Sequence, residues 1–122
     1  ELLSKLKERK IKTVVFSNKA HRFTIMITNY FFKEGLFDEI IGERKGYPRK
    51  PDPYVAIEIM KSLKVKPDET LFIGDSGNDM KTALAAGITP VGVLWGYRNK
   101  AELIDSGAKF IIEKPDEILG LL

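Results

Sequence analysis

The sequence predicts an α/β protein with a Rossmann-like parallel sheet and helices on both of its faces. Short apolar runs typical of buried strands alternate with amphipathic, helix-like segments along the chain. Hydrophobic residues make up 43% of the 122 residues, which is enough to form a core. A strand–helix alternation of this kind favours a parallel, doubly wound sheet.

Four elements are expected in the first half of the chain. The opening segment, ELLSKLKERK, has the pattern of a helix without an N-cap residue. The next run is β-branched and aromatic and predicts a buried strand that ends at Ser17-Asn18. In order, these elements are a helix over 1–10, a strand over 13–16, a helix over 21–33 closed by Gly35, and a strand over 39–42.

A polar loop over 43–52 leads to the second half of the chain. Asp52-Pro53 predicts a helix start, with an acidic N-cap and proline at the first helical position. Glycines are expected to stop the later helices. The expected elements are a helix to Leu63, a strand over 70–73, a helix over 80–86, a strand over 91–95, a helix over 100–106, a strand over 110–112 and a final helix over 115–122.

Composition excludes several kinds of site. The absence of cysteine excludes disulfides, thiolate zinc sites and a cysteine nucleophile, and a single histidine, His21, excludes a histidine cluster. No apolar run approaches the length of a membrane span. The net charge of +3 comes without an aromatic-interleaved basic patch, so nucleic acid is not an expected partner. A cytoplasmic protein is compatible with this composition.

Two polar stretches follow predicted strands, where ligands of open α/β sheets bind, and a third lies in the loop over 43–52. Ser17-Asn18 offers a hydroxyl and backbone N–H groups for an anion, although this stretch taken alone is more typical of a plain strand-to-helix turn in which Ser17 caps the next helix. Lys50 lies between prolines that stiffen its loop, and it is either a fixed positive charge or an exposed lysine. Asp75 and Asp79 suit a hard cation such as Mg²⁺, although Ser76 or Asn78 could be helix caps.

Taken together and in this order, the three stretches resemble the motifs of the haloacid dehalogenase-like hydrolases. VVFSNK is similar to the second motif of that superfamily, KPDP to the third and GDSGND to the fourth. The segments VLWGY and GAKFIIEKPDEILGLL look most like the phosphoglycolate phosphatase branch.

The resemblance implies a role for each matching residue. Ser17 and the backbone N–H of Asn18 would bind the transferring phosphoryl group, and Lys50 would neutralise its charge. Asp75 would bind Mg²⁺, whereas Asp79 would support the metal through water or orient Lys50. The implied activity is that of a Mg²⁺-dependent phosphatase of a small phosphorylated metabolite, acting through an aspartyl-phosphate.

One motif of the resemblance is missing. The family's first motif is an Asp-x-Asp pair that supplies the nucleophile, and no such pair occurs in the 122 residues. We therefore expect residues 1–122, which begin at Glu1, to be a partial core domain without the nucleophile strand and the cap. The central strand would be absent, which would leave two strands with open edges. These strands could pair directly with each other, a second copy in a homodimer could fill the gap, or a missing N-terminal segment could complete the sheet.

Without the nucleophile, this chain alone is expected to be inactive. Sugar-phosphate mutases and pyrophosphatases of the same superfamily share the motifs present here, so both remain alternatives. A non-catalytic α/β module that binds anions or a partner is the alternative from another class.

Overall fold

A computed structural model describes residues 2–32, 35–96 and 99–122. The chain forms two compact units, residues 1–49 and 50–122. Each unit contains its own parallel sheet, and each is described by itself below. Within the described residues, no helix is long and apolar enough to cross a membrane.

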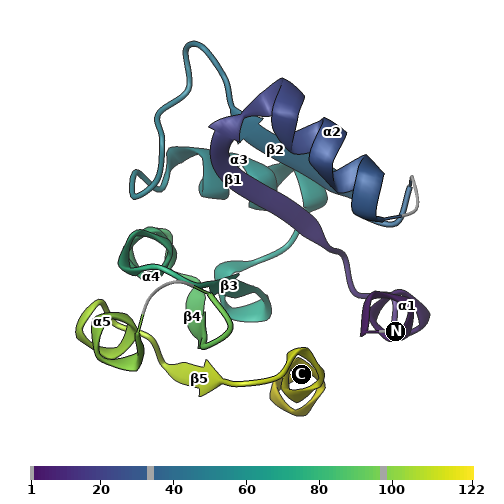
Figure 1. The fold of residues 1–122 in the computed structure, drawn as a ribbon. Coiled ribbons are helices and arrows are strands. Elements are labelled where there is room, and N and C mark those ends of the chain that lie inside the picture. The colour runs from purple at the N-terminus through teal and green to yellow at the C-terminus, as the bar shows by residue number, and fades with distance from the viewer. Residues whose placement is uncertain (1, 33–34, 97–98) are drawn as a thin grey trace. The chain divides into compact units, whose positions relative to one another are not determined.

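The first unit pairs two parallel strands under one helix (Figure 1). Its elements are α1 (Leu2–Glu8), β1 (Val14–Ala20), α2 (His21–Phe31) and β2 (Glu39–Glu43). Helix α2 packs on both strands. The expected helix end at Lys33 lies outside the described residues, and Gly35 has a positive φ of 83°.

Strand β1 is longer than the sequence predicts. It continues past Phe16 to Ala20, but its pairing with β2 is irregular between these two residues. Phe16 pairs with Ile41 and Ala20 with Glu43, so β1 has two more residues than its partner in this interval. The prediction that the strand ends at Ser17-Asn18 was therefore wrong: these residues lie in an irregular part of β1, and irregular pairing of this kind often redirects side chains near functional sites.

The junction between β1 and α2 lies against Gly42 of β2. The Gly42 N–H donates a hydrogen bond to Nδ1 of His21 at 3.0 Å. A Cβ atom at position 42 would lie 2.6 Å from both the Lys19 carbonyl oxygen and the His21 Cα. Glycine is needed here because the backbone of the junction leaves no space for a side chain.

The second unit has a three-stranded parallel sheet in the order β3-β4-β5. Its elements are α3 (Tyr54–Leu63), η1 (Pro67–Glu69), β3 (Leu71–Gly74), α4 (Gly77–Ala85), β4 (Thr89–Val93), α5 (Lys100–Asp105), β5 (Phe110–Ile112) and η2 (Pro115–Leu121). Helix α4 packs on β3 and β4 and also contacts α5. Met80, Ala83, Val91 and Leu103 are fully buried and form the centre of this core.

The predicted α/β class with parallel strands is confirmed, with differences in detail. The parallel strands form two sheets, and β1 and β3 each pair with only one strand among the described residues. The last helix is of the 3₁₀ type. Pro53 takes the N-cap position of α3, although the Asp52 carboxylate still accepts a hydrogen bond from the Tyr54 N–H at 2.9 Å.

Candidate functional site

The segment after β3 positions Asp79 by local hydrogen bonds. Ser76 is the N-cap of α4, and its hydroxyl accepts a hydrogen bond from the Asp79 N–H at 3.3 Å. In return, Oδ2 of Asp79 accepts hydrogen bonds from the Ser76 N–H and hydroxyl and from the Asp75 N–H, at 3.3, 3.1 and 3.1 Å. This is a capping box, so the predicted cap at Ser76 is present and Asp79 is part of it.

The other oxygen of Asp79 binds Lys50. Lys50 Nζ donates to Asp79 Oδ1 at 2.6 Å, and the two side chains are only 10% and 9% exposed. Lys50 Nζ also lies 5.9 Å from the centroid of the Phe72 ring. A charge-assisted hydrogen bond in such a shielded environment is strong, so it holds the ammonium group beside the end of β3.

Asp75 differs from Asp79 in what its carboxylate contacts. Within residues 2–32, 35–96 and 99–122, no hydrogen bond or ion pair engages the Asp75 carboxylate. Its side chain packs against the backbone of Gly96, where an added Cβ would collide with it. Gly74 makes the same kind of close approach to the Asp79 side chain. Among the described residues, the two carboxylates are therefore in different states: Asp79 accepts hydrogen bonds on both oxygens, whereas no donor engages the Asp75 carboxylate.

This donor set fits Mg²⁺ only in part. The described residues contain no group of three or more His, Asp or Glu side chains that could hold a metal. Mg²⁺ usually keeps several waters and takes one or two carboxylates plus substrate phosphate oxygens, which a single available carboxylate could join. Asp75 is accordingly the residue that could bind Mg²⁺ directly, and Asp79 could act on it only through water.

Ser17 and Asn18 belong to the first unit, within the irregularly paired part of β1. The Ser17 hydroxyl oxygen accepts a hydrogen bond from the Lys19 N–H at 3.1 Å, which leaves its O–H free to donate. Ser17 does not cap α2, whose N-cap is Ala20 without a side-chain hydrogen bond. The structure brings Lys50, Asp75 and Asp79 together within the second unit, and the convergence of Ser17 and Asn18 with them stays a prediction.

Sequence reasoning missed Glu102. Its Oε2 accepts a hydrogen bond from the Gly77 N–H, the first backbone N–H of α4, at 2.9 Å. Glu102, Ser76, Gly77 and Asn78 are among the residues that line a cavity of about 240 Å³ beside this helix start. The local pattern shows only that Asn99 caps α5 and that Glu102 is its third residue, so no sequence signal indicates the contact with α4.

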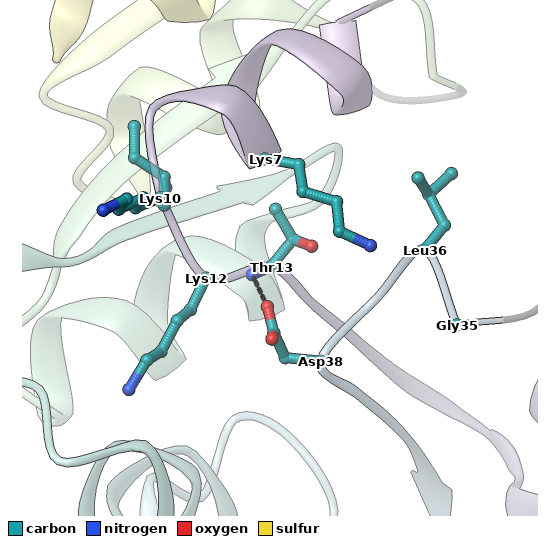
Figure 2. Close-up of a pocket in the computed structure, with 8 residues that line it drawn as sticks. Lys7, Lys10, Lys12, Thr13, Gly35, Leu36 and Asp38 are labelled. Atoms are coloured by element: carbon teal, nitrogen blue, oxygen red, sulfur yellow. Dashed lines mark hydrogen bonds between the residues drawn. The ribbon is translucent and has the colours of Figure 1, made fainter.

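A second cavity, of about 150 Å³, lies in the first unit between the end of α1 and the segment before β2. Figure 2 shows the Asp38 carboxylate bound to the Thr13 N–H, at 2.7 Å. The side chains of Lys7, Lys10 and Lys12 extend in different directions in the same view. They do not converge on one point, so this view gives no indication of an anion site at the cavity.

The sequence profile of the haloacid dehalogenase-like hydrolases matches residues 1–93. The chain belongs to this family. Over 122 residues it is 31% identical to a phosphoglycolate phosphatase from Mannheimia succiniciproducens, covering 100% of this chain and 54% of that protein. A relative from Caldanaerobacter subterraneus that bears a pyrophosphatase name is 33% identical and is covered to 56% of its length.

Solved structures show the same relationship. The crystal structure of a predicted phosphoglycolate phosphatase from Haemophilus somnus matches with a TM-score of 0.90 and 28% identity, covering 98% of this chain and 53% of that chain. A haloacid dehalogenase-superfamily hydrolase from Geobacter sulfurreducens matches with a TM-score of 0.82 and 26% identity, covering 99% and 57%. The chain thus spans about half the length of the relatives it matches.

Proposed function

We propose that these residues are part of a Mg²⁺-dependent phosphatase that acts on a small phosphorylated metabolite in the cytoplasm. The observation that carries the proposal is the shielded Lys50–Asp79 pair, in which Asp79 also accepts a hydrogen bond from the Asp75 N–H, together with an Asp75 carboxylate that no donor engages among the described residues. A hydrolase-family chain with a held positive charge and, within the described part of the same unit, a carboxylate without a donor is suited to bind a phosphoryl group together with a hard cation. Phosphoglycolate is the substrate named among the relatives, and it is the first one to test.

Each residue has a defined part in this proposal. The Lys50 ammonium, oriented by Asp79, neutralises charge on the phosphoryl oxygens. The Ser17 hydroxyl and the Asn18 N–H donate hydrogen bonds to the same group. Asp75 holds the Mg²⁺, which supplies additional charge neutralisation when bound. The carboxylate nucleophile that would form an aspartyl-phosphate belongs to the complete protein, since no Asp-x-Asp pair occurs in this sequence.

Phosphate release from an aryl phosphate with excess Mg²⁺ tests the proposal in two arms. We expect no turnover by the 122-residue chain, because charge neutralisation without a nucleophile leaves the slow hydrolysis almost unaccelerated. We expect turnover by the complete protein, and its loss in Lys50→Met. Robust turnover by the short chain would refute the need for an external nucleophile, and an inactive complete protein would refute the enzyme proposal.

Metal binding gives an independent test. Calorimetric titration of the 122-residue chain with Mg²⁺ should show weak binding, because one available carboxylate is a poor match for this ion. Substituting Asp75→Asn should abolish that binding, whereas Glu58→Gln on α3 should not change it. Micromolar affinity, or binding indifferent to Asp75→Asn, would contradict the assignment of Asp75.

The absence of an Asp-x-Asp pair in these residues also favours a second candidate, a non-catalytic module that binds anions or a partner. It requires that the complete reading frame lack such a pair, so reading that gene separates the two. Pyrophosphatase and sugar-phosphate mutase activities remain alternatives for the complete protein, and both are tested by assaying it with pyrophosphate and with a sugar phosphate.

A further inference from the structure

Helix α2 presents small polar side chains to its own sheet. Thr24 and Thr28 are its buried residues, at 4% and 7% exposure. The Thr28 hydroxyl donates to the Thr24 carbonyl oxygen at 2.7 Å, and the Thr24 hydroxyl donates to Ala20 and Lys19 carbonyl oxygens at 3.2 Å each. Both hydroxyls are therefore satisfied within the helix and its N-terminal junction, so this face can pack closely on β1 and β2 without a partner from elsewhere.

The opposite face of α2 carries large apolar side chains that are exposed. These are Phe23 at 45%, Met26 at 57%, Ile27 at 42%, Tyr30 at 82% and Phe31 at 71% exposure. Their spacing of three and four residues places them on one face of the helix. We call this set the α2 apolar face. An ordinary surface helix has the reverse arrangement, with the large apolar residues toward the sheet.

The size of the α2 apolar face exceeds that of a chance surface feature. Its five side chains, each of about 200 Å² and roughly half to four-fifths exposed, present about 600 Å². That is the upper end of the largest apolar patches on monomeric proteins. Two such faces in contact would bury about 1,200 Å², which reaches the lower limit of standard specific interfaces.

Charge also favours contact between two copies of this face. Helix α2, HRFTIMITNYF, contains no acidic residue, and the guanidinium group of its one arginine, Arg22, lies 5.2 Å from the centroid of the Phe23 ring. The α2 apolar face therefore provides no set of charged groups that could pair with a strongly charged partner. Contact between two copies of the face would bring few like charges close together. Aromatic residues and methionine are the types enriched at interface cores, and a two-fold pair uses the same patch twice.

We propose that the α2 apolar face is a dimerisation surface on which α2 of a second copy of this chain docks. The pairing joins helix to helix through side chains and does not involve the edges of β1 or β3. It is independent of the phosphatase proposal, because it uses none of the site residues.

Analytical ultracentrifugation of the 122-residue chain between about 1 and 200 µM tests this proposal, since dimer formation follows mass action. We expect a monomer–dimer equilibrium, with the dissociation constant raised at least about tenfold by Tyr30→Lys, because each dimer contains the substitution twice. Phe31→Lys should have the same effect. Circular dichroism should show both variants folded, since both side chains point to solvent in the single chain.

Ile104→Lys is the matched control, because Ile104 is 51% exposed on α5 of the other unit. Its dissociation constant should equal that of the unsubstituted chain. A chain that stays monomeric at the highest concentration would overturn the proposal, including the case in which another segment of a longer protein covers this face. A dimer that Tyr30→Lys and Phe31→Lys leave intact would also overturn it, and would point to the strand edges instead.

Discussion

Replacing Asp79 with asparagine tests the central contact of the candidate site. The change removes the negative charge from a pair whose side chains are 10% and 9% exposed and whose N–O distance is 2.6 Å. Removing one partner of a buried ion pair costs about 3–5 kcal/mol, because the remaining charge stays shielded from water without its counter-ion. The amide oxygen of asparagine can still accept from the capping N–H groups, so the roughly 1 kcal/mol of the cap is largely kept. We expect a loss of about 3 kcal/mol.

Urea denaturation of the 122-residue chain, followed by circular dichroism, measures this loss. Lys50→Met and the double variant complete a double-mutant cycle, and the double variant should be less destabilised than the sum of the single ones by about 1–3 kcal/mol. Glu58→Gln is the control, because the Glu58–Lys61 pair is exposed and contributes at most about 0.5 kcal/mol. If Asp79→Asn costs no more than Glu58→Gln, or if the two single effects simply add, the pair does not hold Lys50 in the way described.

Three further substitutions test other contacts. Gly42→Ala should destabilise the first unit by about 1–3 kcal/mol in urea denaturation, because its Cβ would lie 2.6 Å from backbone atoms of the β1–α2 junction. Gly120→Ala is the control and should be neutral, since a Cβ there would meet open space. Equal effects of the two substitutions would contradict the close packing at Gly42. Glu102→Ala should lower the free energy of unfolding by about 0.5–2 kcal/mol, because it removes the acceptor of the Gly77 N–H. Hydrogen exchange at the Gly77 amide should become faster, and slower exchange would contradict this role of Glu102. Two backbone N–H groups at the start of η2 lower the pKa of Glu117, so its contribution to stability is present above the ordinary glutamate pKa and is lost as pH falls through the lowered folded value. Glu117→Gln should flatten this acid limb of the stability profile, and an unchanged limb would refute the assignment.

Much of the secondary structure could be predicted because its signals are local. Strand β5 has the predicted bounds 110–112, and the predicted glycine stops, Gly87 and Gly107, adopt positive φ after α4 and α5. The irregular part of β1 could not be predicted, because the extra residues are defined only by pairing with β2. The type of the last helix was also missed, since proline and an acidic first turn start α and 3₁₀ helices alike.

The candidate site divides in the same way. The motifs around Lys50, Asp75 and Asp79 are recognisable from the sequence, because Asp75 and Asp79 follow a strand end within a few residues and Lys50 lies in a loop between two prolines. The different states of the two carboxylates depend on donors from distant positions, since Lys50 reaches Asp79 across 29 residues. The contact of Glu102 with Gly77 spans 25 residues and has no local pattern.

By itself, the sequence determined the order of strands and helices and the residue types available for phosphate chemistry, because periodicity and capping act over one or two turns of chain. Tertiary structure alone decided which carboxylate is saturated and which face of α2 is exposed. A helical period shows that two faces exist, and only packing against β1 and β2 selects the threonine face for burial and leaves the aromatic one outside.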